Sequence, residues 1–357
     1  MKIKKIFTTI LLTTVCFCGN FFLKSNVSYA KNNDVSEIVL EIESGRVLHE
    51  NNAYSKKYMA STTKILTALC VIENCDVNKE VTVTNKGVGV EGSSIYLEVG
   101  EKLTVLDLLY GLMLRSGNDC AEVLAYQVCG SIEDFANLMN KTALMIGAKN
   151  SNFVNPHGLH NDNHYTTAYD LALISAYALK NQTFREIVST KKKIIPFSTK
   201  NTKRVLVNKN KLLFDFDGAT GVKTGYTKKA GRCLVSSCYR NGMEVVCVVL
   251  NCPPMFERSK ELLNEYLTTY SLKTLFKKKE IVKFLDVEEQ GNKCGLYIKN
   301  DVKVPLSKDE ENNLKTIINT PKTLRKGIKK DTEIGLIEIY ALNNLIFKEK
   351  IYTIIDT

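Results

Sequence analysis

The chain has 357 residues, which is enough for two domains and a sizeable hydrophobic core. Its 49 basic and 38 acidic residues give a formal net charge of +11. A moderate positive field of this size suits an anionic surface such as a cell wall or a membrane, and it also serves solubility. No block of basic residues is interleaved with aromatic ones, so the composition gives no support for nucleic acid as a partner.

The first 30 residues have the pattern of a secretory signal peptide. Three lysines among the first five residues precede a mostly apolar stretch at 6–22, and Ser28-Tyr29-Ala30 suits a signal peptidase. The alternative is an uncut membrane anchor, but Gly19 and Lys24 interrupt the run too early for a full span. We therefore expect an exported, extracytoplasmic protein, and cleavage would lower the net charge from +11 to +7 because four lysines leave.

Eleven cysteines are present, and two of them lie in the predicted signal segment. The remaining nine cannot all pair within one chain. Most of them sit in apolar runs, where cysteine behaves as a small core residue. We expect mostly free thiols.

In the first half of the chain, strands flank a mainly helical region. Residues 37–42 alternate polar and apolar side chains, turn at Ser44-Gly45 and return at 46–49 as a hairpin. Residues 61–190 are then mainly helical. Helical patterns cover 104–114, 121–128, 132–146 with Ser131 as cap, and 167–179.

Strand character returns at 221–226, and a clear hairpin follows with 233–239, an Asn241-Gly242 turn and 243–250. Residues 256–272 resemble a helix. The two hairpins and the single strand make one five-stranded antiparallel sheet, with the terminal helix packed on it. The helical region forms a second lobe, so the fold class is α/β in the α+β sense.

After the Lys277–Lys279 run the pattern changes to short β-branched or alternating segments separated by turns rich in Asn, Gly and Lys. These segments are 281–285, 295–298, 302–305, 334–340 and 346–352. We predict a small C-terminal all-β domain at 281–357, after a first domain at 31–276. No set of catalytic side chains can be assembled within the β domain.

The candidate chemistry begins in the apolar stretch that follows Met59. Residues 65–72 are apolar on almost every side, as in a buried helix, yet its first turn carries Ser61 and Lys64 three residues apart. Positions i and i+3 share one helix face, so the hydroxyl and the amine lie side by side. Ser-x-x-Lys occurs three times in the chain, and only this copy opens a buried helix.

Two further polar elements each occur once in the chain. Ser116-Gly117-Asn118 interrupts two apolar helical stretches, and Lys223-Thr224-Gly225 lies on a predicted strand, where glycine permits close approach of a ligand. Taken singly, each has an ordinary alternative, namely a helix–helix turn and an edge strand with a solvated lysine. The three elements in this order, each on its own type of element, favour a catalytic site.

With these motifs the chain resembles the low-molecular-mass penicillin-binding proteins, the serine-type D-alanyl-D-alanine carboxypeptidases. The likeness is strong over 35–275 and loose over the β domain, and many relatives end in an amphipathic anchor helix that the strand-like residues 351–357 do not match. The further segments that carry it are Gly92–Leu97, Gly100–Val105, Leu114–Asp119, Asn155–Leu159, His164–Asp170, Asn210–Leu213 and Gly221–Thr227.

The resemblance implies catalytic roles for three residues of the first domain. Ser61 attacks the bond between two terminal D-alanines and forms an acyl-enzyme, which water then hydrolyses. Lys64 takes the Ser61 proton, and burial together with a nearby cation would lower its pKa enough for this. Ser116 relays the proton toward the leaving amine.

The remaining implied roles concern binding. Asn118 hydrogen-bonds the substrate backbone, and Lys223 and Thr224 hold its terminal carboxylate, beside Gly225. Backbone N–H groups of Ser61 and Tyr226 form the oxyanion hole, worth about 3–4 kcal/mol per donor. The implied partners are peptidoglycan stem peptides ending in D-Ala-D-Ala and β-lactams as covalent inhibitors, with peripheral membrane or cell-wall association. No metal and no organic cofactor is needed.

Three alternatives remain open at this stage. A β-lactamase of the same superfamily needs a Glu to activate the deacylating water, and none lies between Asp134 and Lys180. A zinc enzyme could use His157, His160 and His164 with Asp162, although the stretch has no His-Glu-x-x-His helix. A binding module without turnover would keep the fold alone.

Overall fold

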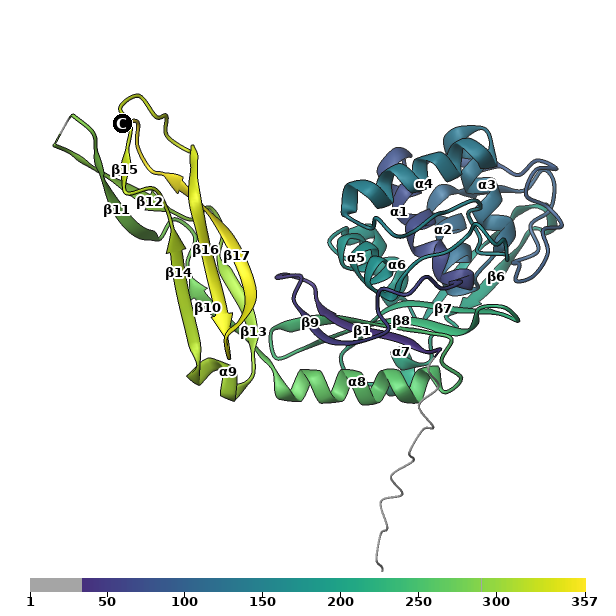
Figure 1. Ribbon diagram of the computed structural model, residues 1–357. Coiled ribbons are helices and arrows are strands. Elements are labelled where there is room, and N and C mark those ends of the chain that lie inside the picture. Colours follow the sequence, from purple (N-terminus) through teal and green to yellow (C-terminus); the bar gives the residue numbers. More distant parts are fainter. Residues whose placement is uncertain (1–33, 290) are drawn as a thin grey trace, which may run out of the picture. The chain divides into compact units, whose positions relative to one another are not determined.

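The computed structural model describes residues 34–289 and 291–357, so the predicted signal segment 1–30 lies outside the described residues. Its first sheet is five-stranded and antiparallel, in the order β2-β1-β9-β8-β7, which confirms the predicted sheet (Figure 1). The strands are β1 Ser36–Glu41, β2 Val47–Asn51, β7 Ala219–Thr227, β8 Gly231–Arg240 and β9 Met243–Leu250.

The hairpin of β8 and β9 follows directly from its turn residues. Asn241 and Gly242 both have positive φ, which is the requirement of the tight turn that matches strand twist. β9 is buried along its whole length because helices cover both faces of the sheet. β7 is the last strand of the sheet, so one edge of it has no strand partner in this sheet.

Helices cover the two faces unequally (Figure 1). Ile38, Leu40 and Val248 face the core of the helical lobe, whereas Val39 and Cys247 face helix α8 on the other side, as the period of two in a strand requires. The helices of this domain are α1 Lys64–Asn74, α2 Val105–Leu114, α3 Asn118–Cys129, α4 Ile132–Ile146, α5 Ala168–Ala178, α6 Gln182–Ser189, α7 Leu212–Asp215 and α8 Met255–Thr269.

Several boundaries differ from the sequence-based expectation. The helix predicted to run to residue 272 ends at Thr269, because the chain turns extended at Tyr270 and begins strand β10 (Ser271–Phe276). Helix α6 was not predicted. Two two-stranded pieces were also not predicted. They are β3 Glu80–Thr82 with β4 Lys102–Thr104, and the hairpin of β5 Lys192–Phe197 and β6 Thr202–Val207, which 3-10 turn η2 (Ser198–Lys200) connects.

The C-terminal region is an all-β domain, as predicted. Its six-stranded sheet has the order β14-β16-β17-β12-β11-β15, and β10 pairs with β13 beside it. The predicted domain boundary between residues 276 and 281 stays a prediction. Strand β10 lies before this boundary, and its partner β13 lies after it. The elements are β11 Ile281–Val287, β12 Lys293–Tyr297, β13 Val302–Leu306, α9 Lys308–Asn312, β14 Leu314–Asn319, β15 Thr323–Leu324, β16 Glu333–Ala341 and β17 Asn344–Thr353.

The nine cysteines of the described residues are all free, and seven of them are buried. Burial raises the pKa of Cys247 to about 12, so that thiol stays protonated. Among residues 34–289 and 291–357, none of the helices combines the length and the apolar character needed to span a bilayer.

Candidate active site

Ser61 lies in a tight turn that precedes the buried helix. The 3-10 turn η1 (Ala60–Thr63) holds Ser61, and α1 begins only at Lys64, so the predicted α-helical first turn is a 3-10 turn. With three residues per turn, positions i and i+3 eclipse each other, which aligns Ser61 with Lys64 more closely than an α-turn would. Ala60 enters the turn with φ of +47°, an uncommon conformation for a residue with a side chain.

A neighbouring loop holds this turn in place. Gly158, with φ of +83°, packs so closely that a Cβ added there would lie 1.9 Å from the Ala60 carbonyl oxygen. The Thr63 hydroxyl lies 2.8 Å from Nε2 of the buried His164, and Thr67 donates to the Pro156 carbonyl at 2.7 Å. The loop at 155–164 is therefore part of the wall behind Ser61.

The Lys64 amine contacts three oxygen atoms. Its Nζ lies 3.0 Å from Ser61 Oγ, 2.7 Å from Asn118 Oδ1 and 2.5 Å from the His157 carbonyl oxygen. The side chain is fully buried and makes no ion pair within the part of the chain that the structure describes. All three partners of this amine are thus uncharged.

These surroundings favour the neutral amine. Burial, and then the charge of Lys223, hold the pKa of Lys64 well below its ordinary value. A neutral amine has two hydrogens and one lone pair, and the His157 and Asn118 oxygens can only accept hydrogen bonds. Both hydrogens therefore go to these two oxygens, and the lone pair points at the Ser61 hydroxyl. This geometry suits Lys64 as a base.

The Ser116-Gly117-Asn118 element forms the corner between α2 and α3. Asn118 begins α3; its Oδ1 accepts from Lys64, and its Nδ2 donates to the Glu91 carbonyl at 2.5 Å. Ser116 is nearly buried with φ of +65°, and its hydroxyl makes no hydrogen bond within residues 34–289 and 291–357. The structure therefore brings Asn118 onto Lys64, while the relay role of Ser116 stays a prediction.

Strand β7 lies against the Ser61 turn. A Cβ added at Gly225 would lie 3.0 Å from the Met59 carbonyl oxygen and 3.1 Å from the Ser61 amide nitrogen, so a side chain there would push the Ser61 turn away by a few tenths of an ångström. Lys223 is buried on the same strand, and burial lowers its pKa to about 7, with a further contribution from the charge of Lys209. The three separated motifs thus meet around one hydroxyl group.

The other two predicted binding residues are more accessible. Thr224 is half-buried, and its carbonyl oxygen accepts from Lys223 Nζ at 2.9 Å. Tyr226 is 61% exposed, and the Arg232 guanidinium lies over its ring. Their predicted roles in binding carboxylate and oxyanion stay predictions.

The contact between Lys64 and the His157 carbonyl was not predicted from the sequence. A contact made by a backbone carbonyl does not depend on the side chain of that residue, so the residue type does not reveal it. The Asn155–Leu159 segment was predicted only as one of the segments that resemble the family. Asn155 Oδ1 accepts from the Gly158 amide at 2.7 Å, which shapes the loop and presents that carbonyl. The only available signal was the Asn-Pro-His-Gly turn itself.

The clustered histidines have separate partners. His157 Nε2 lies 3.4 Å from Glu122, His160 Nε2 lies 3.3 Å from Asp162, and the two nitrogens of His164 engage Thr63 and the Val154 amide. The described residues contain no group of three His, Cys, Asp or Glu side chains placed to hold a metal ion. This arrangement gives the zinc alternative no support.

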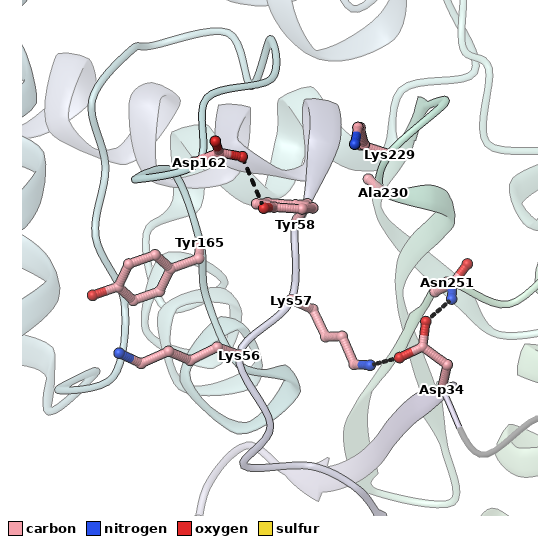
Figure 2. Close-up of a pocket in the computed structure, with 9 residues that line it drawn as sticks. All are labelled: Asp34, Lys56, Lys57, Tyr58, Asp162, Tyr165, Lys229, Ala230 and Asn251. Atoms are coloured by element: carbon pink, nitrogen blue, oxygen red, sulfur yellow. Dashed lines mark hydrogen bonds and ion pairs between the residues drawn. The ribbon is translucent and has the colours of Figure 1, made fainter.

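A hollow of about 460 Å³ lies beside Tyr58, three residues before Ser61 (Figure 2). Its polar side chains contact each other: Tyr58 donates to Asp162 at 3.1 Å, and Asn251 donates to Asp34 at 2.6 Å. The Lys56 ammonium lies 4.3 Å from the centre of the Tyr165 ring. Because these contacts use most of the lining groups, we place the candidate site at Ser61 instead.

Comparison with known proteins identifies the family of the chain. Residues 24–253 match the family model described as D-alanyl-D-alanine carboxypeptidase, and residues 270–356 match the model of the C-terminal domain of penicillin-binding protein 5. The chain belongs to the D-alanyl-D-alanine carboxypeptidase family. Both its fold and its membership of this serine peptidase family agree with the expectation from the motifs.

Three relatives of this carboxypeptidase match between 58% and 93% of the chain. It is 30% identical to the D-alanyl-D-alanine carboxypeptidase DacF of Bacillus subtilis over 93% of this chain and 89% of that protein. It is 36% identical to a D-alanyl-D-alanine carboxypeptidase of a Streptomyces species over 58% of this chain and 76% of that protein. The solved structure of penicillin-binding protein 5 from Haemophilus influenzae matches with a TM-score of 0.81 at 26% identity, over 90% of this chain and 96% of that one.

Proposed function

We propose that this protein removes the terminal D-alanine from peptidoglycan stem pentapeptides through an acyl-enzyme on Ser61. The observation that carries the proposal is the buried Lys64 amine, 3.0 Å from Ser61 Oγ and surrounded only by uncharged oxygen atoms. Family membership supports the substrate class, and the geometry supports the choice of residues.

In the acylation step, Ser61 Oγ attacks the carbonyl carbon of the penultimate D-alanine, and the Ser61 proton passes to Lys64 Nζ. The bond to the terminal D-alanine nitrogen then breaks. That nitrogen takes the proton, with Ser116 as the relay, and free D-alanine leaves. Proton transfer by a positioned side chain of this kind contributes about 10²–10⁴ in rate.

In the second step, water attacks the ester carbonyl. Lys64 accepts a proton from this water and returns one to Ser61 Oγ as the ester bond breaks. The products are the shortened stem peptide and the free enzyme. Asn118 and the His157 carbonyl hold Lys64 in one orientation through both steps, so the same amine serves each time.

Substrate recognition rests on strand β7. Its unpaired edge can accept an extended peptide as an added strand. Lys223, in its charged form, and Thr224 hold the terminal carboxylate, and the backbone N–H groups of Ser61 and Tyr226 hold the oxyanion. The close approach of Gly225 to the Ser61 amide supports this pairing of donors. A bound carboxylate also raises the Lys223 pKa, because it favours the charged amine.

The same chemistry makes the enzyme a target of β-lactams, whose strained amide acylates Ser61. The proposal places the protein outside the cytoplasmic membrane, exported by the segment 1–30, with residues 31–276 as the catalytic domain and 281–357 as the β domain. Its partner there is the cell wall.

The decisive experiment is intact-mass measurement with benzylpenicillin. We expect one acyl adduct per chain, on a peptide that contains Ser61, and release of D-alanine from a pentapeptide. Ser61→Ala is expected to lose both, whereas Ser55→Ala, an exposed serine of the preceding loop, is the matched control and keeps both. Release of D-alanine by Ser61→Ala at the normal rate would refute the mechanism.

Two further outcomes separate the alternatives. A β-lactamase would hydrolyse the adduct within seconds, so a long-lived adduct argues for the carboxypeptidase. A binding module without turnover would give no adduct and no D-alanine. Activity that disappears on chelation and returns with zinc would favour the metal enzyme.

A further inference from the structure

One hairpin of the catalytic domain has an extreme charge pattern. Residues 190–211, which include β5 and β6, contain eight Lys or Arg residues and no Asp or Glu. The two strands pair in regular antiparallel register from Lys192↔Val207 to Phe197↔Thr202. Five of the eight lie on this ribbon, and two of the five are paired with acids of the same domain: Lys200 with Glu98 at 2.6 Å, and Arg204 with Glu101.

The inner face of this ribbon is anchored to the domain. Ile195 and Leu206 are 1% and 2% exposed and belong to the main core. Arg204 forms a buried ion pair with Glu101, which links β6 to the segment before β4. These contacts fix the orientation of the opposite face.

The outer face combines aliphatic and basic side chains. Three cross-strand pairs share it: Ile194 with Val205, Lys192 with Val207, and Pro196 with Lys203. Ile194 and Val205 are each 53% exposed, although both are β-branched residues that strands usually cover. Lys192 and Lys203, at opposite ends of the patch, make no ion pair within the described residues.

The hairpin of β16 and β17 differs from the β5–β6 hairpin, because its exposed lysines have acidic partners. That hairpin also exposes lysines and leucines, but Lys348 pairs with Glu338 at 2.7 Å and Lys350 pairs with Glu333 at 2.8 Å. Its positive charges are neutralised locally. On the outer face of the β5–β6 hairpin, Lys192 and Lys203 have no such partner in the part of the chain that the structure describes, so their field is available to an external anionic surface.

We propose that the outer face of the β5–β6 hairpin docks on the headgroup region of an anionic lipid bilayer. The unpaired lysines complement the negative surface potential, and the aliphatic residues between them enter the boundary between headgroups and acyl chains. An anionic wall polymer would satisfy the lysines alone and would gain nothing from Ile194 or Val205. The central aliphatic pair therefore selects the bilayer. This inference does not depend on the reaction assigned to Ser61.

The first test uses the chain beginning at residue 31, because the apolar segment 6–22 would itself bind lipid, and residues 34–357 form one compact unit. We expect co-sedimentation with phosphatidylglycerol–phosphatidylcholine vesicles and none with phosphatidylcholine alone. Binding should weaken as salt rises, since the charges that act across water are screened within about 10 Å at 0.1 M salt. Equal sedimentation with both kinds of vesicle, or with neither, overturns the proposal.

The second test uses matched variants at exposed positions. Lys192→Glu with Lys203→Glu is expected to weaken vesicle binding by at least about tenfold. The control is Lys315→Glu with Lys326→Glu, which changes the net charge by the same amount but in the β domain. Both lysines are exposed and make no ion pair among the described residues. This control should change vesicle binding by less than about twofold. Ile194→Ser with Val205→Ser should also weaken binding. If this last variant binds like the parent, the aliphatic pair has no part in docking and the proposal of a bilayer is wrong.

A spectroscopic readout is available because the chain contains no tryptophan. Val205→Trp should show a blue shift of emission on anionic vesicles, and Leu345→Trp, at a 43% exposed position of the other hairpin, should not. A soluble polyglycerol phosphate serves as the competing partner. If the polymer binds as tightly as the vesicles and Val205→Trp shows no shift with lipid, the surface is a polymer site and the proposal is wrong.

Discussion

The two faces of the five-stranded sheet treat buried charge in opposite ways. On the face that carries α8, Glu37 of β1 receives Arg258 at 2.8 and 2.9 Å and His49 at 3.3 Å. Burial works against ionisation of Glu37, but the hydrogen bonds from His49 and Arg258 outweigh it and lower its pKa to about 2. On the face that carries α1, Lys64 and Lys223 are buried with no carboxylate bonded to them in the described residues, and their pKa values fall.

The difference separates stability from chemistry. A paired ion is held charged and contributes to folding only while both partners remain. An unpaired buried amine is driven toward its neutral form, which weakens the fold but creates a base. Each face can be tested by removing its cation and measuring both stability and activity.

The largest effect is expected from Lys64→Met, which replaces the amine with an apolar side chain of similar length. Acylation by benzylpenicillin should fall by about 10³–10⁴, because among the described residues Lys64 is the only side-chain base hydrogen-bonded to Ser61 Oγ. The free energy of unfolding should change by less than about 1 kcal/mol, since relief of the buried amine offsets the lost hydrogen bonds. Stopped-flow acylation and urea unfolding measure the two quantities. Lys141→Met, at an exposed position of α4, is the control.

Arg258→Met should reverse this pattern. Removing the guanidinium leaves the Glu37 carboxylate with only His49, so we expect a loss of about 3 kcal/mol in unfolding free energy. Acylation by the folded fraction should be unchanged, because α8 packs on the opposite face from Ser61. Arg325→Met, an exposed substitution, serves as the control for both measurements. If a folded Arg258→Met variant showed impaired acylation, the proposed separation of stability on the α8 face from chemistry on the α1 face would be wrong.

The pH dependence of carboxypeptidase activity should sharpen the comparison further. As pH rises through about 7, free Lys223 loses the charge that holds the substrate carboxylate, so kcat/KM should fall on the alkaline side. Two pH units above that value the loss should be about a hundredfold. Lys223→Arg keeps its charge at every accessible pH and should remove this alkaline limb. An identical limb in parent and variant would exclude Lys223 as its source.

The smallest effect concerns stability against pH. At pH values between about 7 and the ordinary lysine pKa of 10.5, Lys223 is protonated in the unfolded protein and neutral in the folded protein. The unfolded state therefore binds more protons, and unfolding free energy should rise by about 1 kcal/mol per pH unit across this window. Below pH 4.5 the Glu37 contribution has the same sign, because the unfolded state again binds more protons, and stability is lost as pH falls toward 2. Urea titrations at pH 7 and 9 test the alkaline arm, and Lys223→Met should flatten it.

Much of the fold follows from local patterns. The Asn241-Gly242 turn between two β-branched runs predicts β8 and β9, and Ser131 caps α4 through the Asp134 amide as expected. The β5–β6 hairpin was missed because its lysine-rich sequence resembles a solvated loop. Only alternate positions, Ile195 and Leu206, carry the buried face. Short strands such as β15, with two residues, lie below what periodicity can detect.

The candidate site was predictable as a set of side chains but not as a geometry. Three motifs indicated Ser61, Lys64, Asn118 and Lys223, and the structure brings them together. The 3-10 turn at Ser61 depends on Ala60 adopting φ of +47°, which no propensity of alanine would suggest. Asn118 proved to be a partner of Lys64, and the third oxygen on that amine comes from the backbone.

Selection by an antibiotic cannot act through substitution of Gly158, which lies in the loop behind Ser61. Any side chain there would displace the Ala60 carbonyl and with it the nucleophile, so a mutant that excludes a drug by this route would also lose its own reaction. An exposed residue such as Tyr226 can change without moving this turn.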